Sequence, residues 1–339
     1  MNTQDILEIK ALLATPKQIA IIPHKNPDGD AIGSTLGLLQ YLLILNHDAK
    51  IIAPNDFPDF LKWLPQVNLI QIHETDKDET EAFINTADVI FTLDFNAFHR
   101  TGNMESILAN STSLKIMIDH HQQPEDYANY MYSDVAMSST CEMVYHFLEK
   151  LEALNTITSD IATCLYVGIM TDTGSFRYRS TTSTTHRIIA SLIDKGADNT
   201  LIHNCVYDTN SYNRLQLLGC ALRNLKVLPD YRTAYITLSQ QELRDLDYKK
   251  GDTEGFVNYA LSLNNTVLAA IFIEDKKQGI IKISLRSKGH FSVNELSRAH
   301  FNGGGHTNAA GGKSDSCLES TVEKFISILP AYRKALNNE

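Results

Sequence analysis

The sequence has no apolar run long enough to cross a bilayer. Its longest aliphatic stretches, such as Leu42 to Leu45, fall far short of the roughly 20 apolar residues that a membrane-spanning helix needs. The first ten residues include Asp5 and Glu8, and they show neither the basic start nor the apolar core of an export signal. We therefore expect a cytoplasmic protein with no membrane partner.

Paired cysteines are also missing. The chain has five cysteines, an odd number, and none of them forms a C-x-x-C pair. A zinc site built from cysteine pairs is therefore excluded. A catalytic thiolate is not favoured either, because no cysteine stands beside a candidate histidine base in a loop. We expect reduced thiols, several of them in helices of the core.

Basic residues are fewer than acidic residues in this chain. The chain has 30 Lys and Arg against 40 Asp and Glu, which gives a formal net charge of −10. A protein that coats long nucleic acid would carry a basic surface, so this class is disfavoured, whereas a short anionic substrate needs only a local basic patch. The apolar fraction of 43% and the charged fraction of 21% are ordinary for a folded globular protein. The length of 339 residues suggests about two domains.

Short apolar segments alternate with helical patterns in the first part of the chain. Strands are expected at 18–23, 50–53, 87–93 and 114–118. Helices are expected at 30–46, 138–151, 159–170 and 184–195. This alternation predicts an α/β domain with a doubly wound parallel sheet.

The later part of the chain has strand-like and helical segments in a different order from the first part. Segments 232–238, 266–273 and 280–285 are rich in β-forming residues, while 239–246, 253–263 and 316–336 have helical patterns. This mixture predicts a smaller α+β domain with a mixed sheet. We place the first domain at 1–198, a helical linker at 199–226 and the second domain at 227–339.

Acidic and histidine side chains follow the expected strands of the first domain. The set comprises His24, Asp28 and Asp30 after the first strand, Asp94 after a later one, Asp119, His120 and His121 after the next, and Asp172 at the end of the helix 159–170. In an open α/β sheet, ligands bind outside the carboxyl ends of the strands. We therefore expect these side chains to converge on one crevice.

Each of these residues taken alone has a plainer interpretation. A single Asp after a strand is usually a turn residue or a helix cap, and His24 could be a satisfied core histidine. Their convergence changes this, because several carboxylates and imidazoles in one crevice repel one another or stay unsatisfied without a cation. Carboxylate and imidazole together suit a divalent metal, with Mn²⁺ favoured over Ca²⁺ because of the imidazoles.

The second domain contains a basic segment of its own. Between positions 276 and 313, seven basic residues accompany a single acid. This segment also contains a glycine-rich run, Gly303, Gly304, Gly305 and His306. Glycine N–H groups and Arg286 could bind phosphate together. A solvated basic face and tight packing of the glycines remain open as alternatives.

These motifs resemble those of the DHH phosphoesterase superfamily. The resemblance rests on the four motifs in the family's order: His24-x-x-x-Asp28-x-Asp30-Ala31-x-Gly33-Ser34, the single Asp94, the triplet Asp119-His120-His121, and Asp172. Further along, Ser284-Leu285-Arg286-Ser287, Gly303-Gly304-Gly305-His306 and Ala309-Ala310-Gly311-Gly312 resemble the associated DHHA1 domain. Asn302 stands where the family commonly has a further glycine. The two-domain layout is most similar to the bifunctional oligoribonuclease (nano-RNase) and pAp phosphatase subfamily.

The resemblance implies a site with two divalent metal ions, Mn²⁺ favoured and Mg²⁺ or Co²⁺ as alternatives. His24 and Asp28 would bind one ion, Asp30, His120 and Asp172 the other, and Asp94 would bridge the two. His121 would face the scissile phosphate as a catalytic residue, and Asp119 would orient neighbouring groups. Arg286, Gly303, Gly304, Gly305 and His306 would bind the substrate.

The function implied by the resemblance is hydrolysis of short oligoribonucleotides from the 3′ end and of 3′-phosphoadenosine 5′-phosphate (pAp). Alternatives are a phosphodiesterase acting on cyclic-di-AMP or pApA, an exopolyphosphatase or pyrophosphatase, and a nucleotide sensor without activity. The complete metal motifs argue against a sensor. A homodimer is left open.

Overall fold

The computed structural model describes residues 1–338, which fold as two compact units; the first is Met1–Thr209 and the second begins at Asn210. The segment 199–226, expected to link domains 1–198 and 227–339, is divided between the units. Helix α8 (Asn199–Tyr207) belongs to the first unit and α9 (Tyr212–Arg223) to the second. Within the described residues, no helix combines the length and apolar character that a membrane span requires.

The first unit is built on a six-stranded sheet in the order β3-β2-β1-β4-β5-β6, and every neighbouring pair is parallel. Its strands are β1 (Gln18–Ile22), β2 (Asp48–Ala53), β3 (Ile70–Ile72), β4 (Val89–Leu93), β5 (Leu114–Asp119) and β6 (Tyr130–Ser133). The doubly wound α/β fold is therefore confirmed. The edge strands β3 and β6 were not expected, because they are short and mostly only half-buried and so lack an apolar run.

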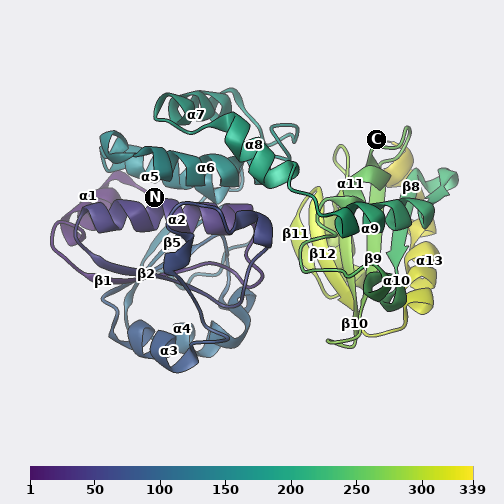
Figure 1. Ribbon diagram of the computed structural model, residues 1–339, viewed down its shortest axis with the longest axis horizontal. Coiled ribbons are helices and arrows are strands. Elements are labelled where there is room, and N and C mark those ends of the chain that lie inside the picture. Colours follow the sequence, from purple (N-terminus) through teal and green to yellow (C-terminus); the bar gives the residue numbers. More distant parts are fainter. Residues whose placement is uncertain (339) are drawn as a thin grey trace. The chain divides into compact units, whose positions relative to one another are not determined.

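Helices cover both faces of this sheet (Figure 1). On one face lie α1 (Thr3–Leu12), α2 (Gly29–Ile44), α5 (Thr140–Lys150) and α6 (Ser159–Asp172), which share a core with the strands. On the other lie α3 (Lys77–Thr86) and α4 (Glu105–Asn110). Helix α7 (Ser183–Asp194) packs against α6 and α5. This arrangement buries the strands on both sides, as their continuous apolar sequences require.

The strand order reverses between β1 and β4, which lie side by side at the centre of the sheet. From β1 the chain continues outward to β2 and β3, and from β4 it continues the other way to β5 and β6. Such a switch point leaves a crevice beyond the carboxyl ends of the two central strands, where ligands of this fold class bind. The loops that leave β1 and β4 therefore border the natural binding position.

Two glycines allow α2, α5 and α6 to meet closely behind this crevice. A Cβ on Gly33 would lie 2.5 Å from the Cys164 carbonyl oxygen. A Cβ on Gly168 would collide with the Cys141 sulfur and lie 3.0 Å from Asp30 Oδ1. The neighbouring atoms belong to backbone or to fully buried side chains, so they have no room to move. Both positions therefore require glycine.

The second unit contains a mixed sheet in the order β11-β12-β10-β9-β8-β7, as expected, in which only β8 and β9 pair in parallel. Its strands are β7 (Lys226–Leu228), β8 (Thr233–Leu238), β9 (Leu268–Asp275), β10 (Ile280–Ser287), β11 (Gly304–His306) and β12 (Ala309–Ser314). Its remaining helices are α10 (Gln240–Asp245), α11 (Phe256–Leu261), α12 (Val293–His300) and α13 (Leu318–Asn337). Strands β11 and β12 were missed because glycine and alanine dominate them.

We predict that Gly168→Ala destabilises the first unit by about 1–3 kcal/mol, the usual cost of forcing a methyl group into a filled core. Gly219→Ala is the matched control. Gly219 lies inside α9, and a Cβ there would meet no atom within 4 Å. This change should stabilise the protein by about 0.5–1 kcal/mol through helix propensity. Urea unfolding followed by circular dichroism measures both effects, and unchanged stability in Gly168→Ala would contradict the packing argument.

Candidate metal centre

The structure brings together all eight side chains predicted for the metal and catalytic site. They lie at the carboxyl ends of β1, β4 and β5 and at the end of α6. The eight residues are His24, Asp28, Asp30, Asp94, Asp119, His120, His121 and Asp172. The capping role that was considered for Asp30 falls to Asp28, whose Oδ1 accepts hydrogen bonds from the backbone of Asp30 and Ala31. Asp30 is therefore available for another role.

A first group forms around His24. Its Nε2 lies 3.3 Å from Asp94 Oδ2 and 3.9 Å from Asp28 Oδ1. Its Nδ1 lies 2.9 Å from the Lys25 carbonyl oxygen, which can only accept, so Nδ1 carries the hydrogen. Burial opposes a charged ring, but the hydrogen bond to Asp94 and the charge of Asp28 raise the pKa of His24. The Nε2 atom thus faces carboxylates, as in a metal-binding histidine.

A second group forms around His120. Its Nε2 lies 3.6 Å from Asp30 Oδ2, 3.5 Å from Asp94 Oδ1 and 3.5 Å from Asp172 Oδ2. Its Nδ1 lies 3.2 Å from the Met137 carbonyl oxygen and so donates to it. Burial opposes a charged ring here too, but these three carboxylates raise the pKa of His120 well above its usual value. One imidazole nitrogen therefore sits at the meeting point of three carboxylates.

Asp94 stands between the two groups. Its Oδ2 is the oxygen near His24, whereas its Oδ1 is the oxygen near His120. The residue is 2% exposed and has a φ of 64°, a left-handed conformation that Asp tolerates better than most residues. Burial opposes its charge, but hydrogen bonds from His120 and His24 hold the pKa of Asp94 well below its ordinary value. Each oxygen of the Asp94 carboxylate thus faces a different group of side chains.

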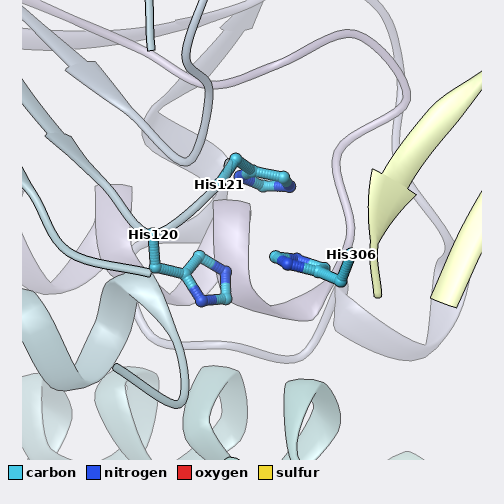
Figure 2. Close-up of side chains that lie close together, drawn as sticks. All are labelled: His120, His121 and His306. Carbon is cyan, nitrogen blue, oxygen red and sulfur yellow. The ribbon is translucent and has the colours of Figure 1, made fainter. Parts of the chain in front are cut away.

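His121 is hydrogen-bonded to Asp119. The Asp119 carboxylate, fully buried, accepts from His121 Nδ1 at 2.7 Å and from its backbone N–H at 3.1 Å. Burial lowers the pKa of His121 despite this hydrogen bond, and nearby Arg100 lowers it further. The rings of His120 and His121 meet edge to face, with centroids 5.1 Å apart (Figure 2). The orientation of His121 is therefore fixed through Nδ1.

The donor set fits a divalent cation. Asp30 is almost completely buried, and burial followed by repulsion from Asp94 and Asp172 raises the pKa of Asp30 well above its ordinary value. Such crowding of carboxylates is costly, and a divalent cation among them removes the repulsion. Oxygen donors mixed with imidazole are typical of Mn²⁺ and similar ions. The side chains close enough to hold a metal include His24, Asp28 and Asp94 as one group, Asp30, His120 and Asp172 as a second, and Asp94, Asp119 and His121 as a third.

The predicted substrate residues all belong to the second unit, where strand register aligns two of them. Arg286 on β10 pairs with Ala309 on β12, and Ala309 pairs with His306 on β11. Residues directly opposite one another point to the same face of a sheet. Arg286 and His306 therefore flank the small Ala309 side chain on one face; of these three residues, Figure 2 labels His306. The buried Nε of Arg286 has no hydrogen-bond partner within the described residues.

The glycine run serves packing as well. A Cβ on Gly303 would collide with the Gly311 carbonyl oxygen, and one on Gly305 would collide with that of Ala309. Gly304 to His306 form strand β11. Asn302 has a φ of 49° and thus adopts the left-handed backbone that suits asparagine. The packing interpretation therefore accounts for two of the three glycines, while a Cβ on Gly304 would meet no atom closer than 3.5 Å.

Sequence reasoning missed two residues at the metal centre. Thr140 contacts both Asp30 and Asp94 from the start of α5. The polar run from Ser138 to Thr140 before a helical pattern signals a helix start, but it does not reveal which side chains that start contacts. The charge of Arg100 opposes the rise in the pKa of the buried His24 and contributes to the lowered pKa of His121, so Arg100 acts electrostatically on the site. An arginine six positions after Asp94 carries no motif that would single it out.

Comparison with known proteins finds two domain families in this chain. The model of the DHH family, N-terminal domain, matches residues 18–169, and that of the DHHA1 domain matches residues 232–335. The resemblance inferred from the sequence is thereby confirmed. The two matched ranges fall in the first and second unit respectively.

Individual relatives match over nearly their full lengths. The probable bifunctional oligoribonuclease and PAP phosphatase NrnA of Streptococcus mutans is 30% identical, with 92% of this chain and 95% of the relative covered. The bifunctional oligoribonuclease and PAP phosphatase NrnA of Thermus thermophilus is 28% identical, with 97% and 94% covered. The crystal structure of an exopolyphosphatase-related protein from Bacteroides fragilis is 41% identical, covers 98% of each chain and superposes with a TM-score of 0.93.

We predict different effects for the two adjacent histidines. His120→Ala should weaken Mn²⁺ binding, because it removes the nitrogen at the meeting point of three carboxylates. His121→Ala should leave bound metal nearly unchanged and lower kcat by roughly 100-fold or more, as expected for the loss of a group that stabilises the transition state. Metal analysis of the purified variants and steady-state kinetics test both. Metal loss in His121→Ala but not in His120→Ala would reverse the assignment.

Proposed function

The chain belongs to the DHH family, with a DHHA1 domain after the DHH domain, and we propose that it is a metal-dependent phosphoesterase that hydrolyses short oligoribonucleotides and pAp. The cluster of carboxylates and imidazoles at the switch point carries this proposal. The Streptococcus mutans and Thermus thermophilus relatives support the choice of substrate, because both are named for these two activities and match over nearly their whole length.

We assign two divalent ions to the centre, with Mn²⁺ favoured. His24 and Asp28 would hold one ion, Asp30, His120 and Asp172 the other, and Asp94 would contribute one oxygen to each. Two such ions supply an activated water and neutralise charge on the phosphoryl oxygens of the substrate. The carboxylates of this chain would set the positions of both ions. Asp30 and Asp94 are buried, whereas Asp28 and Asp172 are partly exposed on the open side of the site.

His121 would act on the scissile phosphate through Nε2. Its Nδ1 hydrogen is bound by Asp119, so a proton exchanged with the substrate would pass through the other ring nitrogen, Nε2. Carrying a proton there, it would stabilise the charge that develops on the phosphoryl oxygens or protonate the leaving oxygen. Asp119 would favour the charged ring during this step and would keep the ring in one orientation.

The second unit would bind a further phosphate of the substrate. Arg286 and His306 flank Ala309 on one face of the sheet, and the Arg286 guanidinium has a nitrogen without a hydrogen-bond partner in the described structure. Guanidinium groups recognise phosphate through paired hydrogen bonds. pAp and oligonucleotides with a terminal phosphate carry more than one phosphate, which is consistent with a phosphate contact at Arg286.

Polyphosphate hydrolysis is the second candidate function. The Bacteroides fragilis protein, which is 41% identical over 98% of the chain, is described as exopolyphosphatase-related. The same metal centre would serve either reaction, because both cleave a bond to phosphorus by attack of water. The two candidates differ in whether the substrate carries nucleosides.

We predict that the enzyme with Mn²⁺ prefers an RNA dinucleotide and pAp over a long unstructured RNA, cyclic-di-AMP, pyrophosphate and polyphosphate. Initial rates on this panel, with the metal-free protein as control, test the proposal. Rapid turnover of polyphosphate with none of the dinucleotide would favour the second candidate. Equal rates on the long RNA and the dinucleotide would contradict the preference for short substrates.

We predict that Arg286→Ala lowers kcat/KM for pAp and the dinucleotide by about 10- to 150-fold, which corresponds to loss of about 1.5–3 kcal/mol from a charge-assisted phosphate contact. Lys282→Ala is the matched control, because Lys282 lies on the same strand but pairs with Asp275 at 2.7 Å. It should leave kcat/KM nearly unchanged. A minimal chromogenic phosphodiester with a single phosphate should be much less sensitive to Arg286→Ala, and equal losses on all substrates would refute the proposed contact.

A further inference from the structure

The first turn of α5 is anchored by buried polar contacts. Ser139 caps the helix by accepting from the Glu142 N–H at 3.0 Å. The Glu142 carboxylate, 2% exposed, accepts from the hydroxyl groups of Ser138 and of Thr185 on α7. These contacts hold the helix start in one position relative to the rest of the first unit. Backbone groups in this turn are therefore rigidly placed.

Two N–H groups of this turn bind the Asp30 carboxylate. The Thr140 N–H donates to Oδ2 at 2.6 Å, and the Cys141 N–H donates to Oδ1 at 2.8 Å. Both oxygens of Asp30 are thus oriented by backbone groups at the positive end of a helix, where a carboxylate is stabilised. The Cys141 thiol next to them takes no part as a thiolate, because burial and the charge of Asp30 raise its pKa well above the usual value.

The Thr140 side chain binds the other central carboxylate. Its hydroxyl donates to Asp94 Oδ1 at 2.9 Å, and the residue is completely buried. Oδ1 is the oxygen that faces His120, whereas Oδ2 faces His24. The hydroxyl group therefore fixes the rotation of the Asp94 carboxylate. This rotation determines that Oδ1 faces His120 and Oδ2 faces His24. The hydroxyl group occupies one lone pair of Oδ1 and leaves the other directed at the His120 group.

We propose that Thr140 is a positioning residue for the metal centre, which sets the geometry of Asp30 through its backbone and that of Asp94 through its hydroxyl group. This inference rests on the metal centre of the proposed function. A residue in this position acts on the affinity for metal, because partners behind the ligands typically contribute 10- to 100-fold to metal binding or activity. It does not contact the substrate, so it affects KM for the substrate little.

A purely structural role for Thr140 makes a different prediction. A buried hydroxyl group that only satisfies a hydrogen bond would affect stability without changing metal affinity. Thr140→Val removes the hydroxyl group and keeps the size, the branching and the backbone N–H. Thr140→Ser restores the hydroxyl group on a smaller side chain. Thr35→Val is the matched control, because the Thr35 hydroxyl is equally buried in the same unit and donates only to helix carbonyl groups.

The test measures Mn²⁺ binding by titration calorimetry and by the electron paramagnetic resonance signal of free Mn²⁺, with stability followed by urea unfolding. We expect Thr140→Val to weaken Mn²⁺ binding by about 10- to 100-fold. We expect Thr140→Ser and Thr35→Val to bind Mn²⁺ nearly as the unaltered protein does. In activity assays, raising Mn²⁺ should largely restore kcat of Thr140→Val, with KM for the dinucleotide unchanged throughout.

The outcomes separate this inference from the function on which it rests. A folded Thr140→Val that binds Mn²⁺ as tightly as the unaltered protein would overturn the positioning role and leave the metal centre intact. Failure of the unaltered protein itself to bind Mn²⁺, Mg²⁺ or Co²⁺ would overturn the metal centre. Equal weakening in Thr35→Val would also refute the inference, because the effect would then follow from any lost buried hydroxyl group.

Discussion

Repulsion among buried carboxylates is the constraint on which the first unit depends. Asp30 and Asp94 are almost completely buried and lie close enough for each to disfavour the charge of the other. The fold supplies compensating groups: the imidazoles of His24 and His120 and the N–H groups at the start of α5. The close packing that requires Gly33 and Gly168 brings α5 and α6 against α2, and so places the start of α5 beside Asp30. The imidazoles come instead from the loops after β1 and β5.

The second unit differs from the first in its local charge. The protein as a whole is acidic, with a formal net charge of −10, yet the segment 276–313 is strongly basic. Within it Lys282 is neutralised by Asp275, while Arg286 keeps a buried nitrogen that lacks a partner in the described structure. Such a nitrogen is costly unless an anion binds to it. The first unit thus gathers buried carboxylates, whereas the second contains a basic segment.

The sequence by itself was enough to predict the fold class and which acidic and histidine side chains lie close together at the carboxyl ends of the strands. Buried parallel strands such as β1 and β4 are continuous apolar runs, and the residues that follow them in the chain must lie at their carboxyl ends. His24, Asp94 and His120 could therefore be grouped before any coordinates were known. Short strands were not predicted from the sequence. Strands β3 and β6 lie at the sheet edge and are mostly half-buried, and β11 packs through glycines and has no apolar pattern.

Only the tertiary structure decided which atoms meet. The sequence places Thr140 over 40 residues from Asp94 and over 100 from Asp30, so no local pattern links its hydroxyl group to one carboxylate and its N–H to the other. The assignment of Asp94 Oδ1 to His120 and Oδ2 to His24 likewise depends on how β1, β4 and β5 align. The row of Arg286, Ala309 and His306 follows from strand register, which is a property of paired strands. Residue types and strand ends are encoded locally, whereas these contacts arise from long-range packing, which a single sequence does not display.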